Sequence, residues 1–114
     1  MKLIEKIKEV TNNNEELMED YFYTIHETVL NEITEYDALD KYIHMRNQIK
    51  EGKTLTQAPR VATNFDFSDY DTIRMVERKS DDIAYFLIHN MEVNDFSEWI
   101  KDFDRIKFEA KKLA

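Results

Sequence analysis

The sequence contains no cysteine, and it has only one glycine (Gly52) and one proline (Pro59) among 114 residues. The absence of cysteine excludes a disulfide framework, thiol catalysis and a zinc site with cysteine ligands. Glycine and proline are the strongest local breakers of regular structure, so their scarcity leaves few natural interruptions. The sequence therefore favours long helices over a fold with many turns.

Long hydrophobic runs and a positive net charge are also missing. The longest purely apolar run, 83–88, is far shorter than the roughly 20 residues that a membrane span needs. The net charge of −8 disfavours direct binding to a phosphate backbone. The first ten residues carry a charge at every second or third position, unlike a secretory signal. We therefore expect a cytoplasmic protein that contacts neither membrane nor nucleic acid directly.

The stretch from 14 to 50 has the hydrophobic spacing of a helix, because similar side chains recur every three or four residues. The two ridges read Leu17, Tyr21, Ile25, Val29, Ile33 and Tyr36, then Leu39, Tyr42, Ile43, Arg46 and Ile49. One unbroken helix would be about 55 Å long, too long for a compact domain of this size. We predict two helices instead, over 14–34 and 37–51, with Asp37 capping the second and Asp40 three residues later.

The second half of the chain is less clearly patterned. Gly52 marks a helix stop, and we expect a connecting loop at 53–67. Ser68 with Asp71 would cap one helix in the following stretch, and Ser80 with Asp81 and Asp82 would cap another, whereas the run 83–88 is rich in strand formers. A hairpin at 72–90 would lack glycine and asparagine in its turn, so helix is preferred. The apolar stripe over 95–113 predicts a terminal helix with Trp99 and Phe103 buried.

These patterns predict an all-α fold, a small single-domain bundle of four to six helices spanning 1–114. The length is that of one domain, and 42% hydrophobic residues can form a core without metal or disulfide. An α+β fold with a hairpin at 72–90 is the alternative.

The strongest feature is an excess of negative charge on the helical stretch. Residues 9–40 contain no lysine or arginine, and their carboxylates are Glu9, Glu15, Glu16, Glu19, Asp20, Glu27, Glu32, Glu35, Asp37 and Asp40. On a helix this gives about one charge per 5 Å, against about 3.4 Å along one DNA strand. Folding Asp66, Asp69, Asp71, Asp81 and Asp82 onto the same side would raise that density. A solubilising surface without a partner is the plain alternative.

We therefore predict a non-enzymatic inhibitor or modulator that docks its acidic face on the basic groove of a nucleic-acid-handling protein. Small phage-encoded anti-restriction and anti-CRISPR proteins are similar in kind. Exposed tyrosines beside carboxylates suit such an interface. The predicted partner-binding residues are Glu15, Glu16, Glu19, Asp20, Tyr21, Tyr23, Glu27, Glu32, Glu35, Asp37 and Asp40. We expect no cofactor and no metal.

Two other functions stay open. The motif Glu15-Glu16-x-x-Glu19 resembles the first half of the magnesium site of MazG-type nucleotide pyrophosphohydrolases. That resemblance implies an all-α, Mg-dependent hydrolase, but the later Glu-x-x-Asp of the family is replaced by Glu32-x-x-Glu35 or Asp37-x-x-Asp40. Cations gather instead near the two ends and the middle of the chain. This separation of charge would also suit a helical accessory protein that forms a homodimer.

Overall fold

The structure is a computed structural model that describes residues 1–57 and 65–100. Five helices lie in this part of the chain: α1 (Leu3–Thr11), α2 (Glu15–Tyr36), α3 (Leu39–Lys50), α4 (Tyr70–Asn90) and α5 (Val93–Trp99). No strand is found among the described residues, where only Lys2 and Glu92 form an isolated β-bridge. The predicted all-α class is confirmed, and α4 excludes the alternative hairpin at 72–90.

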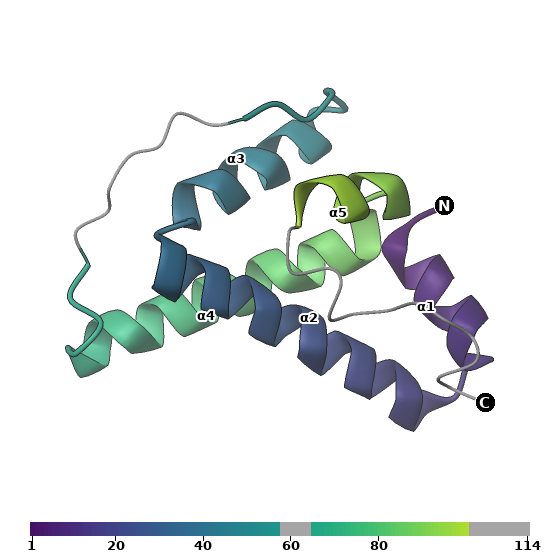
Figure 1. Ribbon diagram of the computed structural model, residues 1–114, viewed down its shortest axis with the longest axis horizontal. Coiled ribbons are helices and arrows are strands. Elements are labelled where there is room, and N and C mark those ends of the chain that lie inside the picture. Colours follow the sequence, from purple (N-terminus) through teal and green to yellow (C-terminus); the bar gives the residue numbers. More distant parts are fainter. Residues whose placement is uncertain (58–64, 101–114) are drawn as a thin grey trace.

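Helix α2 is the central element, and it crosses α4 in the middle of the molecule (Figure 1). Asn14 caps α2 as its side chain accepts a hydrogen bond from the backbone N–H of Leu17 (3.1 Å). Glu15 and Glu16 occupy the first turn, where the helix dipole favours acids. The outer residues of α2 are therefore carried on a long, well-capped helix.

The predicted division between two helices is confirmed, but the predicted cap of the second helix is wrong. Asp37 ends α2 in the left-handed conformation (φ 53°) instead of capping α3. Ala38 precedes α3 and makes no side-chain cap, so Asp40 completes no capping box. The chain reverses at Asp37 because a short aspartate tolerates positive φ better than most residues do.

Gly52 terminates the α3 region with a positive φ of 68°, as the sequence predicts. The backbone N–H groups of Gly52 and Lys53 donate to the carbonyls of Ile49 and Gln48. The described parts of the predicted loop, 53–57 and 65–67, contain no regular secondary structure. Residues 58–64 lie outside the described part.

Helix α4 is one continuous helix of 21 residues. Asp69 is its cap and accepts hydrogen bonds from the backbone and the hydroxyl of Thr72. Ser80 does not start a second helix, because its buried hydroxyl donates to the Val76 carbonyl one turn earlier (2.8 Å). A serine in that arrangement stays inside a helix.

The predicted terminal helix has different bounds in the structure. Helix α5 starts at Val93 and ends at Trp99, and Ile100 is extended. Trp99 is partly buried against the core rather than fully buried. Phe103 and the remainder of the predicted segment lie outside the described residues.

The core is formed by apolar side chains from all five helices. Those without measurable exposure include Leu3, Ile7, Ile25, Val29, Tyr42, Val76, Ala84, Leu87, Met91 and Phe96. Helix α4 packs on α1, α2 and α3, while α5 packs on α1. This arrangement buries one side of α2 and leaves its other side facing outward. None of the five described helices combines the length and the hydropathy that a membrane span requires.

Candidate protein-binding surface

The outward side of α2 carries a row of polar and aromatic side chains. Glu16, Asp20, Tyr23, Glu27 and Asn31 follow at spacings of four, three, four and four, so they lie along one side of the helix. The first four are exposed, and Tyr23 is 70% exposed. Because α2 contains no lysine or arginine, nothing on the helix itself neutralises these carboxylates.

The structure places the predicted partner-binding residues in three environments. The exposed members on α2 are Glu15, Glu16, Glu19, Asp20, Tyr23, Glu27 and Glu35. Asp37 and Asp40 are half-buried at the turn between α2 and α3. Tyr21 and Glu32 are buried. A partner cannot reach these two in this conformation, so we remove both from the contact surface.

Tyr21 belongs to the core, whereas Tyr23 faces solvent. Tyr21 is 8% exposed on the same side of α2 as Ile25, four residues later. Burial raises the pKa of the Tyr21 hydroxyl above its ordinary value, so the ring stays neutral over a wider pH range. Tyr23 alone therefore supplies an outward tyrosine from this part of α2.

Glu32 joins α2 to α3. The hydroxyl of Tyr42 donates a hydrogen bond to Glu32 Oε2, and Lys41 Nζ lies 3.5 Å from Glu32 Oε1. The sequence contained a signal for this burial, because Glu32 follows Ile25 by seven residues and so lies on the same side of the helix. Counting acids without their helical position missed that signal.

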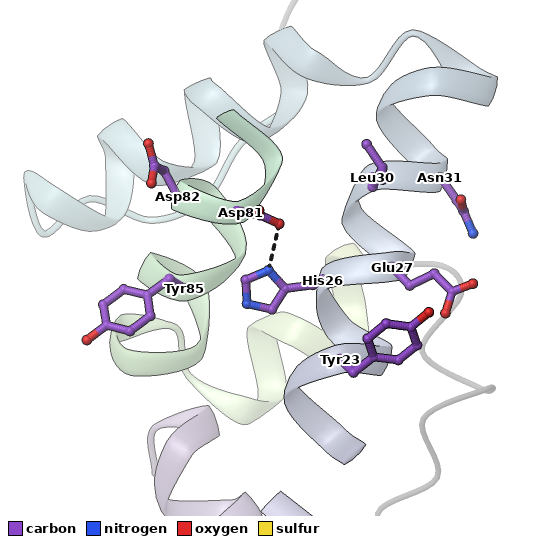
Figure 2. A pocket seen from close by; sticks show the side chains of 8 residues that line it. All are labelled: Tyr23, His26, Glu27, Leu30, Asn31, Asp81, Asp82 and Tyr85. Carbon is purple, nitrogen blue, oxygen red and sulfur yellow. Dashed lines mark hydrogen bonds and ion pairs between the residues drawn. The ribbon is translucent and has the colours of Figure 1, made fainter. Parts of the chain in front are cut away.

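An open groove of about 720 Å³ lies between α2 and α4 (Figure 2). Its lining residues are Tyr23, His26, Glu27, Leu30, Asn31, Asp81, Asp82 and Tyr85. His26 and Asp81 point toward one another across the groove, with His26 Nδ1 3.2 Å from Asp81 Oδ1. Glu27 and Asp82 lie on opposite sides of this pair, one on each helix. The fold thus adds carboxylates of α4 to the acidic side of α2.

The other aspartates considered from the sequence do not join this surface. Asp71 precedes Asp81 by ten residues, about 15 Å along the helix. Asp69 caps α4, and Asp66 accepts hydrogen bonds from the backbone and hydroxyl of Ser68. The hydrogen bond from the Ser68 hydroxyl lowers the pKa of the Asp66 carboxyl below its usual value, and the hydrogen bond from the Ser68 backbone N–H lowers it further. These carboxylates serve the start of α4 instead.

The geometry gives no support to a MazG-like metal site. Glu16 and Glu32 lie on the same helix, separated by about 24 Å along its axis, so the two halves of the motif cannot share an ion. Within 1–57 and 65–100, no group of three or more histidine or acidic side chains is placed to hold a metal.

Comparisons with protein-family models, with curated proteins and with solved structures give no match to this chain. The exposed surface of α2 and the groove beside it are therefore the features from which we infer a function.

Proposed function

We propose that the protein is an inhibitor or modulator that docks the outward side of α2 on a basic, nucleic-acid-binding surface of another protein. The observation that carries the proposal is the exposure of the acidic row on α2, with no cation on the same helix. The proposed action is occupation of the partner's groove and includes no catalytic step.

The spacing of charge supports this proposal. The exposed carboxylates of α2 are Glu15, Glu16, Glu19, Asp20, Glu27 and Glu35. Over the length of the helix they average roughly one per 6 Å, and Asp81 with Asp82 raises this to roughly one per 4 Å. A single DNA strand carries one charge per about 3.4 Å. A groove that binds a single strand would therefore meet a similar density of negative charge.

The charge pattern also sets the expected kinetics. Exposed rim charges mainly steer the encounter of two proteins, so they speed association more than they slow dissociation. Their attraction is screened over about 8 Å at physiological ionic strength. Binding should therefore weaken as salt is added, and the partner should release DNA or RNA when this protein binds.

The test uses a triple variant, Glu16→Lys, Glu19→Lys and Asp20→Lys. A partner is first captured from host extract with the wild-type chain and purified. Association and dissociation rates are then measured at several salt concentrations, together with competition by DNA or RNA. We expect the triple variant to associate at least tenfold more slowly while keeping its fold, since such steering raises on-rates by about 10 to 10³.

A matched control changes the net charge equally at other exposed sites. Glu51→Lys, Asp71→Lys and Glu98→Lys lie outside α2 and should slow association much less. Equal effects of the two triples would show that only net charge matters. The proposal is wrong if affinity ignores salt and the partner binds nucleic acid at the same time. The homodimer stays a prediction, which sedimentation of the purified chain tests directly.

A further inference from the structure

Two exposed tyrosines lie at opposite rims of the groove between α2 and α4. Tyr23 projects from α2 and is 70% exposed, and Tyr85 projects from α4 and is 63% exposed. Figure 2 shows them on either side of the His26–Asp81 pair. Large exposed aromatics beside a groove are characteristic of protein interfaces, where tyrosine is enriched.

Other aromatic rings of this chain already carry a cation from the chain itself. Lys41 lies 5.4 Å from the centre of the Tyr42 ring, and Lys50 lies 5.4 Å from that of Phe86. The Arg74 guanidinium lies 5.8 Å from the centre of the Tyr70 ring. Within the described ranges, no lysine or arginine lies over the ring of Tyr23 or of Tyr85.

The carboxylates of the groove add negative charge between these rings. Asp81 pairs with His26, whereas no cation from the described part of the chain pairs with Glu27 or Asp82. The Tyr85 ring already stacks on His89, with the two ring centres 4.3 Å apart. The groove therefore offers the Tyr23 ring, the remaining face of the Tyr85 ring and two carboxylates without an ion pair. A planar cation satisfies both kinds of group at once, because it can stack on a ring and donate to a carboxylate.

We propose that this groove receives an arginine side chain from an exposed segment of the partner protein. The inference rests on the proposed function and adds which residue type the partner inserts. Arginine fits better than lysine because its flat guanidinium stacks on aromatic rings and binds carboxylates in a fork. Arginine is also the cation enriched at protein interfaces, where lysine is depleted.

Arg78 allows the effect of a nearby positive charge on arginine binding to be tested. It lies exposed on α4, four residues before Asp82, which places it one turn away on the same side. No ion pair between Arg78 and Asp82 is present in the structure. Arg78 does not line the groove, but its positive charge lies one helical turn from Asp82, so Arg78→Ala should strengthen the binding of an incoming arginine.

The test does not require the natural partner. The full chain, labelled with ¹⁵N, is titrated with a capped Gly-Arg-Arg-Gly peptide and with its lysine counterpart, and shifts are followed by NMR. We expect the largest shifts at Tyr23, His26, Asp82 and Tyr85. We expect binding of the arginine peptide to be about two- to fivefold tighter than that of the lysine peptide.

Matched tyrosine variants locate the effect. Tyr85→Ala should weaken the arginine peptide about two- to fivefold, the cost of one exposed cation–π contact. Tyr70→Ala is the control, because Tyr70 is 69% exposed on the same helix but lies outside the groove. Its removal should leave the affinity unchanged. Both substitutions are at exposed sites, so the fold should survive.

The inference is overturned if the two peptides bind equally and Tyr85→Ala changes nothing. Shifts concentrated at Glu15, Glu16 and Glu19 would likewise overturn it. It also fails if the free chain is a dimer whose interface covers Tyr85, because a second copy would then be the occupant. The proposed function is judged separately, by the salt dependence and nucleic-acid competition of the natural partner.

Discussion

Glu27 and Glu32 lie five residues apart on α2 and have opposite environments. Five residues turn a helix by about 140°, so the two carboxylates leave different sides. Glu27 is exposed at the rim of the groove, whereas Glu32 is 6% exposed. Glu32 accepts a hydrogen bond from Tyr42 and has Lys41 beside it. Composition alone treats the two residues as equivalent.

The difference separates a carboxylate that is bonded inside the fold from one that is exposed to solvent. A buried carboxylate loses hydration and must be compensated by donors, as Tyr42 and Lys41 do for Glu32. An exposed carboxylate keeps its water and needs no partner within the chain, so Glu27 stays available to another molecule. Glu32 fixes the turn between α2 and α3, while Glu27 contributes to the proposed contact surface.

The largest effect on this comparison should come from Tyr42→Phe. The substitution keeps the ring in the core and removes only the hydroxyl that donates to Glu32. Removing one donor from a buried carboxylate costs about 1 to 3 kcal/mol of unfolding free energy. Urea unfolding of the variant and the wild type measures this loss.

Tyr70→Phe is the control for Tyr42→Phe, because the Tyr70 hydroxyl belongs to an exposed ring. Its unfolding free energy should change by less than about 0.5 kcal/mol. Combining Tyr42→Phe with Glu32→Met should cost less than the sum of the two single changes, since the residues act as a pair. Additive losses would show that the hydroxyl and the carboxylate act independently.

A smaller effect should come from the same substitution placed on each side of α2. Glu32→Gln keeps an oxygen that can accept from Tyr42 but loses the charge that faces Lys41. We expect a loss of about 0.5 to 1.5 kcal/mol in unfolding free energy. Glu27→Gln should change stability by less than about 0.5 kcal/mol. The order of the two values would reverse if the exposed carboxylate were the structural one.

Much of the fold could be predicted from local patterns. The apolar ridge through Ile25 and Val29 predicted α2, and Gly52 predicted the end of the α3 region. The prediction that Asp37 caps α3 was wrong because aspartate suits both the start of a helix and a left-handed helix end. The prediction that a helix starts at Ser80 was wrong because a serine hydroxyl can also donate to a carbonyl of the preceding helical turn. Both errors concern short polar side chains, which can bond to the nearby backbone in more than one way.

The candidate site could be predicted only in part. The exposed acids of α2 followed from composition, and the burial of Glu32 was readable from its position seven residues after Ile25. The groove could not be predicted, because it depends on how α2 crosses α4. Asp82 and Tyr85 approach Glu27 only through that crossing, from more than fifty residues away in the sequence. A single sequence shows which side of each helix is apolar, but it does not show which helices pack against each other.

The smallest effect concerns an exposed carboxylate that does have partners, Glu92. Its side chain lies 2.7 Å from the amino group of Met1 and 3.5 Å from Lys2 Nζ. Beside this pair, the Leu3 N–H donates to the Met91 carbonyl (2.8 Å), which ties the start of α1 to the end of α4. Glu92 is thus a third case, exposed like Glu27 but paired like Glu32.

The pH dependence of Glu92→Gln shows whether this exposed pair contributes. The hydrogen bond from the Met1 amino group lowers the pKa of Glu92, so its contribution is present above pH about 4.3 and is lost as the pH falls through the lowered value. Glu92 in turn raises the pKa of that amino group, so its contribution is present below pH about 8 and is lost as the pH rises through the raised value. We expect Glu92→Gln to lower Tm slightly at pH about 6 and to change it less at both extremes.

The control is Glu98→Gln, because Glu98 is an exposed glutamate of α5 outside every ion pair found in the described ranges. This substitution should leave the pH profile of Tm unchanged. Identical profiles for the two variants would mean that solvent screening cancels the Glu92 pair, which is the usual outcome for exposed ion pairs.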